Sequence, residues 1–127
     1  MPTRAQVMLP ALSAQVRVAR RWAVMTLADW CMAHACENAS LVLDELAANA
    51  VRHAGGHTFR VWLLTDCRTG LVIMVEDSSQ LMPVRSDPDP LAESGRGLRI
   101  VEAFADQWDA YATATGKAVW ALLSLDP

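Results

Sequence analysis

The amino-acid sequence predicts an α+β fold, a two-layer sandwich in which helices cover one face of a mostly antiparallel sheet. Three observations support this prediction: two early segments with apolar residues at helical spacing, two apolar runs joined by a short polar loop, and a closing helix followed by a hairpin pattern. The chain has 127 residues, of which 53% are hydrophobic. This length and composition fit a single domain over 1–127 with an ordinary buried core.

The first half of the chain is predicted to form a short strand and two helices. Residues 7–9 are expected to be an edge strand, and a helix over 13–34 follows with Ser13 as its N-cap. The apolar positions of this helix fall on one face: Val16, Ala19, Ala23 and Leu27. A second helix, capped by Asn38 or Ser40, is expected to end at about Ala54, because Gly55 and Gly56 follow.

The second half is predicted to contain two hairpins separated by a loop and a helix. Strands are expected over 58–65 and 70–77, and a loop over 78–96 holds Pro83, Pro88 and Pro90. Apolar residues at helical spacing then predict a helix over 97–107. Strands over 109–115 and 118–125 would close the chain around a turn at Gly116 and Lys117.

Composition narrows the classes of function. The net charge is −3 and no basic block is present, so nucleic acid is not an expected partner. No stretch is apolar for long enough to span a membrane, and the first residues do not lead into a signal core, so we expect a cytoplasmic protein. Cys31, His34 and Cys36 resemble a metal-ligand cluster, but without a clear fourth ligand we favour reduced thiols.

The predicted second helix carries the most informative polar residues. Glu45, Asn49, Arg52 and His53 recur at helical spacing beside an apolar stripe. An amide oxygen can ligate a hard cation such as Mg²⁺, and a carboxylate one turn away can orient or deprotonate a nucleophile. From this helix alone, a solvated polar face is the more common explanation.

Two further features can complete a nucleotide site. Asp77 ends an apolar strand, where its carboxylate could accept a hydrogen bond from an exocyclic amine of a base, although such a residue often only initiates a turn. Gly95, Arg96 and Gly97 open the predicted helix 97–107, where free N–H groups and a positive dipole end favour a phosphate. A flexible loop end is the alternative, and a Walker motif is absent from the sequence.

These segments resemble, in order, the conserved boxes of the GHKL ATPases. The resemblance is closest to the small actinobacterial anti-sigma-factor serine/threonine kinases of the RsbW and SpoIIAB type, and covers nearly the whole chain. The N-box resembles LDELAANAVRHA at 43–54, the G1 box VEDSS at 75–79, and the G2 box GRGLRIV at 95–101. The closing hairpin of the family is similar to GKAVWA at 116–121.

The resemblance implies a Bergerat ATP-binding fold with ATP and Mg²⁺ as cofactors. It implies that Asn49 ligates Mg²⁺, that Glu45 is the general base for phosphoryl transfer to a serine or threonine, and that Asp77 binds the adenine amino group. The remaining ATP-binding residues it implies, with 78–96 as the ATP lid, are Arg52, His53, Gly95, Arg96, Gly97, Leu98 and Lys117. For Lys117, exposure in a turn is the more common arrangement.

The resemblance also implies partners: a sigma factor sequestered by the kinase, a STAS-type anti-anti-sigma protein that it phosphorylates, and a second copy in a homodimer. The chain departs from the family at Ser79, where the broader family has glycine, and at Ala118, where threonine is common. A nucleotide-gated interaction module without phosphotransfer is therefore the alternative function. A detached histidine-kinase-like ATPase domain ranks third, because the chain lacks a phosphohistidine helix pair.

Overall fold

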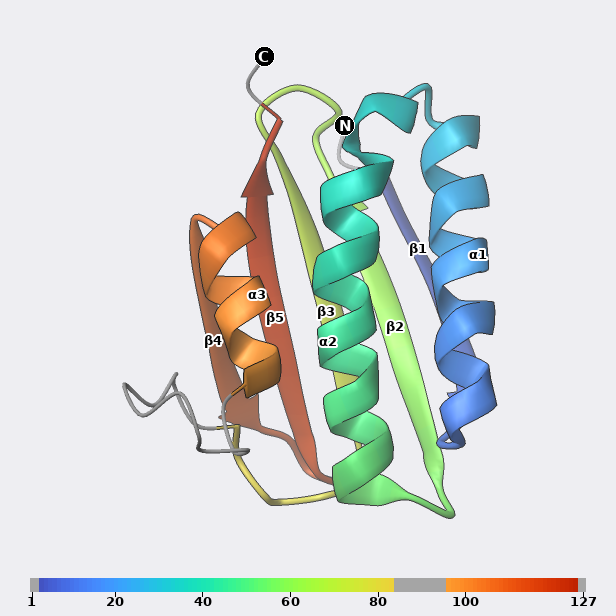
Figure 1. Cartoon of the computed structure of the whole chain (residues 1–127), viewed down its shortest axis with the longest axis vertical. Coiled ribbons are helices and arrows are strands. Elements are labelled where there is room, and N and C mark those ends of the chain that lie inside the picture. The colour runs from blue at the N-terminus through green and yellow to red at the C-terminus, as the bar shows by residue number, and fades with distance from the viewer. Residues whose placement is uncertain (1–2, 84–95, 126–127) are drawn as a thin grey trace.

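A computed structural model describes residues 3–83 and 96–125 and shows the predicted α+β fold (Figure 1). The helices form one layer in front of a five-stranded sheet. In chain order the elements are β1 (Thr3–Pro10), α1 (Ser13–Asp29), a 3₁₀ turn (Ala33–Ala35), α2 (Cys36–Ala54), β2 (Thr58–Thr65), β3 (Gly70–Asp77), α3 (Arg96–Phe104), β4 (Gln107–Ala112) and β5 (Lys117–Ser124).

The sheet is entirely antiparallel, with strand order β1-β2-β3-β5-β4. β3 is its central strand, and α2 lies over β2 and β3 in the middle of the helix layer, with α1 and α3 on either side (Figure 1). Every second residue of β2 and β3 is buried because it faces the helices. Side chains such as Phe59, Val61 and Ile73 form the core there with Leu43 and Leu46 of α2.

The predicted helix over 13–34 is wrong in its C-terminal part, since α1 ends at Asp29. Cys31 adopts a left-handed backbone with φ of 59°. Its N–H donates to the Ala28 carbonyl at 3.0 Å, and the Met32 N–H donates to the Leu27 carbonyl at 2.7 Å. These two bonds form a Schellman motif, which closes a helix usually at a glycine. With cysteine in place of glycine at this position, the helix end could not be recognised from the residue types.

The predicted helix starts and the second hairpin also need correction. Neither Ser13 nor Asn38 nor Ser40 is an N-cap: α1 begins at Ser13 after Leu12, and α2 continues from the 3₁₀ turn without a side-chain cap. The third helix ends at Phe104, and β4 begins two residues before the predicted strand. The strands at 58–65 and 70–77, and the end of α2 before Gly55, are confirmed.

The sheet face opposite the helices carries an apolar surface. In the register, Trp62 of β2 pairs with Met74 of β3, which pairs with Trp120 of β5. Leu64, Val72 and Leu122 form the next row in the same way, and all six are half-buried. We name these six residues the open-face strip. Among the five tryptophans, Trp108 is buried in the core, whereas Trp62 and Trp120 lie on this strip.

No helix in the described ranges is long and apolar enough to cross a membrane. Cys31, Cys36 and Cys67 are free thiols, of which Cys31 and Cys67 are exposed. No group of three or more His, Cys, Asp or Glu side chains among the described residues is placed to hold a metal ion. Cys31, His34 and Cys36 are thus not brought together as such a group.

Candidate functional site

Three of the predicted site residues meet at one end of the sandwich, and a fourth, Asn49, lies one helical turn from them. Asn49 and His53 lie one turn apart near the C-terminal end of α2. Asp77 ends β3, and Lys117 begins β5 directly opposite it in the register. The antiparallel pairing of β3 with β5 thus brings residues 40 positions apart in sequence into contact under the end of α2.

The centre of this cluster is a buried ion pair. The Lys117 ammonium lies 2.8 Å from Asp77 Oδ2 and 3.1 Å from Asp77 Oδ1. The Lys117 side chain is 0% exposed and that of Asp77 is 1% exposed. The expectation that Lys117 is an exposed turn residue is therefore wrong. Its strand position turns the side chain toward the helices, where a lone charge would be very costly and only the carboxylate makes burial tolerable.

His53 is the third member of the cluster. Its Nδ1 lies 3.1 Å from Lys117 Nζ. Because an ammonium can only donate, Nδ1 must accept and is unprotonated in this contact. Burial lowers the pKa of His53, with the Lys117 and Arg52 charges acting in the same direction, while Asp77 and a backbone hydrogen bond to Leu81 oppose this shift. The imidazole is thus favoured in its neutral form and links α2 to the segment after β3.

The segment after β3 is attached to the same carboxylate. The Ser79 N–H donates to Asp77 Oδ1 at 2.8 Å, and the Leu81 N–H donates to Ser79 Oγ at 3.0 Å. Gly116 makes room for this arrangement, because a Cβ atom there would lie 1.9 Å from the Asp77 carbonyl oxygen. Sequence reasoning missed this role of Gly116, which it placed only in a turn.

Glu45 and Asn49 lie on α2, two helical turns and one helical turn before His53, respectively. Asn49 is 7% exposed, which is unusual for a carboxamide that only decorates a helix surface. Glu45 is half-buried, and burial raises its pKa, with a smaller rise from Asp44 and an opposing effect of Arg52. The alternative of a fully solvated polar face is therefore wrong for these two residues, whereas Arg52 is exposed.

The predicted phosphate-binding segment is described only from Arg96 onward. Gly95 and residues 84–95 of the predicted lid are outside the described residues. Arg96 and Gly97 form the start of α3, as predicted, and Leu98 is buried in the core. α3 packs beside α2, so its first turn and the C-terminal half of α2 lie at the same end of the molecule (Figure 1).

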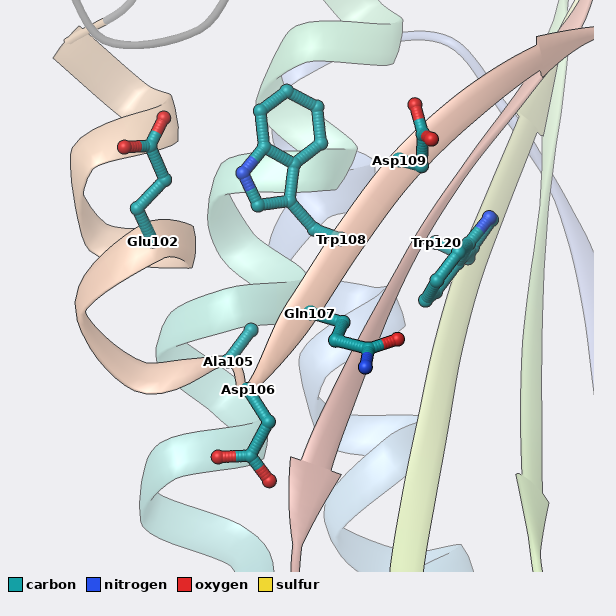
Figure 2. Close-up of a pocket in the computed structure, with 7 residues that line it drawn as sticks. All are labelled: Glu102, Ala105, Asp106, Gln107, Trp108, Asp109 and Trp120. Atoms are coloured by element: carbon teal, nitrogen blue, oxygen red, sulfur yellow. The ribbon is translucent and has the colours of Figure 1, made fainter.

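A separate hollow of about 400 Å³ lies between α3 and β4. Figure 2 shows its lining, with the indole of Trp108 on the helix side of the sheet and that of Trp120 on the other side. None of the predicted site residues is among the described residues that line it. Its wall includes Glu102, Asp106 and Asp109, an acidic surface unsuited to phosphate groups.

Comparison with family models gives a match to the histidine kinase-like ATPase domain over residues 9–123. This chain belongs to the histidine kinase-like ATPase (GHKL) family. A comparison with curated proteins found no match. The family assignment and the helix-over-sheet fold together identify a GHKL-type ATP-binding domain.

The polar groups of the candidate site fit a purine nucleotide. A buried carboxyl group paired with an ammonium offers acceptor oxygens to a base amino group, and a buried carboxamide on the adjacent helix offers an oxygen to a cation. The exposed Arg52 on α2 supplies positive charge nearby. The role of each residue toward ATP stays a prediction, as does the site for Mg²⁺.

Proposed function

We propose that this GHKL domain is a serine/threonine protein kinase that transfers the γ-phosphate of Mg-ATP to a STAS-type anti-anti-sigma protein. By sequestering a sigma factor, it would also regulate transcription. In this proposal Asn49 ligates Mg²⁺, Asp77 accepts a hydrogen bond from the adenine amino group, and Glu45 is the general base. The phosphates would lie against Arg52 and the first turn of α3.

The environment of Glu45 is the observation that carries the kinase assignment. A general base works best when its pKa lies closer to the working pH than that of an ordinary carboxylate. Burial raises the pKa of Glu45, and the residue lies one helical turn from the buried Asn49. A purely structural glutamate gains nothing from this desolvation, whereas a base beside a metal-bound phosphate would.

The kinase proposal is tested with labelled ATP, Mg²⁺ and purified STAS-domain proteins from the same genome. Wild type is expected to label a serine or threonine, and Glu45→Gln should lower the rate by roughly 100-fold or more, the usual contribution of a general base. Glu37→Gln is the matched control, because Glu37 is an exposed glutamate in the first turn of the same helix. Tight ATP binding without any transfer by wild type would contradict the kinase assignment.

A nucleotide-gated interaction module is the second candidate. Ser79 supports it, because this residue stands where the broader family has glycine and forms the turn after Asp77 through two hydrogen bonds. In such a module, partner binding requires Mg-ATP but survives Glu45→Gln. Equal partner affinity with and without Mg-ATP would rule out this candidate, and a phosphohistidine on the partner would instead favour the detached histidine-kinase role.

The open-face strip supports a second copy of this chain as a partner. Its two rows are arranged symmetrically about β3: Trp62 and Trp120 flank Met74, and Leu64 and Leu122 flank Val72. A two-fold axis parallel to β3 would place the tryptophan of β2 in one protomer over that of β5 in the other. Such self-complementarity is what an isologous interface requires.

The dimer proposal predicts that one charge at the centre of the strip separates the protomers. Met74→Glu places a carboxylate between the two tryptophans and should convert a dimer to a monomer in sedimentation equilibrium. Met25→Glu is the matched control, because Met25 is 63% exposed on α1, on the other side of the molecule. A wild-type protein that is monomeric at high concentration would contradict this interface.

A further inference from the structure

Lys117 is the only lysine of the chain, and its ammonium is enclosed in the interior. An ammonium has three N–H donors and no acceptor. Three acceptors surround Lys117 Nζ: Asp77 Oδ2 at 2.8 Å, Asp77 Oδ1 at 3.1 Å and His53 Nδ1 at 3.1 Å. These partners and the complete burial of Lys117 turn its ammonium away from a phosphate, which argues against the phosphate-binding role that the family resemblance implied.

Asp77 has acceptor capacity left. Its Oδ1 accepts from both the Ser79 N–H and Lys117. Within the described ranges, the contact of Oδ2 is the ion pair with Lys117, so Oδ2 keeps acceptor capacity that no described protein group uses. An ionised carboxylate can only accept hydrogen bonds, whereas a protonated one can also donate. The charge state of Asp77 thus decides which chemical group it can bind.

We propose that Lys117 is a positioning residue that holds Asp77 as an acceptor-only carboxylate, and thereby makes the site specific for a 6-aminopurine over a 6-oxopurine. This inference rests on the nucleotide binding proposed above. A 6-amino group donates to Oδ2, whereas a 6-oxo group presents a lone pair to a lone pair. In nearly complete burial, such a mismatch has no water to relieve it.

Removal of Lys117 reverses the chemistry of Asp77. A buried carboxyl group without a counter-ion favours its neutral form, and the protonated group can donate to a 6-oxo oxygen as well as accept from a 6-amino group. Discrimination between the two purines is then expected to fall and to depend on pH. A lysine that only filled space or stabilised the hairpin would alter the affinities for both nucleotides together.

The test compares dissociation constants of Mg-ATP and Mg-ITP, its 6-oxo analogue, by calorimetry between about pH 6 and pH 9. Wild type should favour ATP by roughly 10- to 100-fold, the effect of one unsatisfied buried hydrogen bond. Lys117→Met should lose most of this preference at low pH and regain part of it at high pH. The double variant Asp77→Asn/Lys117→Met, which leaves no unpaired buried charge, should discriminate little at any pH because an amide both donates and accepts.

The outcomes separate this inference from the proposed function. Binding of neither nucleotide by wild type would refute the nucleotide site itself. Equal binding of ATP and ITP by wild type, or a preference that Lys117→Met retains at every pH, would overturn the role of Lys117 and leave ATP binding intact. If Lys117→Met does not fold, the double variant decides: an undiminished ATP preference in that protein contradicts the inference.

Discussion

Two ion pairs in this domain have the same chemistry and opposite surroundings. Arg20 of α1 donates to Asp44 of α2 at 3.1 Å, and these side chains are 45% and 30% exposed. Lys117 and Asp77 form the other pair, at 0% and 1% exposed. Water reaches both side chains of the first pair, whereas the second pair is enclosed and contacts only protein groups, among them His53 and the Ser79 N–H. The comparison teaches that position, not charge, decides what each pair contributes.

The choice of cation also differs between the two pairs. Of the eleven lysine and arginine residues of the chain, ten are arginines, and the single lysine is buried. A guanidinium is planar with five donors in a fixed fork, whereas an ammonium is compact with three. The three acceptors around Lys117 match the ammonium, so an arginine would leave donors unsatisfied in the interior.

Breaking the buried pair is expected to have the largest effect. Lys117→Met leaves the Asp77 carboxylate buried without a counter-ion and should lower the free energy of unfolding by about 3–5 kcal/mol. Asp77→Asn/Lys117→Met should recover most of this loss, since neither charge remains. Urea unfolding followed by tryptophan fluorescence measures both. A single variant as stable as wild type would mean that the carboxylate reaches water after all.

A side chain at Gly116, beside the buried pair, is expected to have the second-largest effect on the free energy of unfolding. A Cβ atom at Gly116 would lie 1.9 Å from the Asp77 carbonyl oxygen, so Gly116→Ala must separate β3 from β5 at this end. We expect a loss of roughly 1–3 kcal/mol in the free energy of unfolding. Gly70→Ala is the control, because its Cβ would meet the end of the Leu122 side chain at 3.0 Å and the Leu123 carbonyl oxygen at an ordinary contact distance of 3.6 Å. Equal losses in both variants would contradict a special role for Gly116.

The sequence predicted the strands flanking the buried pair because apolar alternation is strong there. The short hairpin loop between β2 and β3 was also predicted, and Asp77 at the end of β3 was recognised as a site candidate. Burial of Lys117 was not predictable, because a lysine after a glycine is usually solvated and only the pairing of β3 with β5 supplies its counter-ion. The end of α1 was missed for a similar reason, since Cys31 adopts the backbone conformation that a glycine normally marks.

Protonation of His53 is expected to weaken the buried cluster less than loss of Lys117. The folded state lowers the pKa of His53 below its usual value of 6.5, so below about that pH the unfolded chain binds a proton that the folded chain resists. Stability should therefore fall as pH drops from this value toward the lowered pKa. In His53→Gln, whose amide oxygen can still accept from Lys117, this part of the pH dependence should disappear. His57→Gln, an exposed control, should keep it.

The exposed pair is expected to contribute least. Arg20→Gln should lower the free energy of unfolding by about 0.2–1 kcal/mol, because the pair is solvated and its long side chains lose freedom when it forms. Its interaction energy should shrink further in high salt, which screens exposed charges far more than buried ones. A double-mutant cycle over Arg20 and Asp44, set beside one over Lys117 and Asp77, measures both interaction energies directly. Asp44 is itself partly buried, and burial raises its pKa while the charge of Arg20 lowers it. A coupling energy between Arg20 and Asp44 as large as that between Lys117 and Asp77 would therefore show that Asp44 depends on its partner as strongly as Asp77 does.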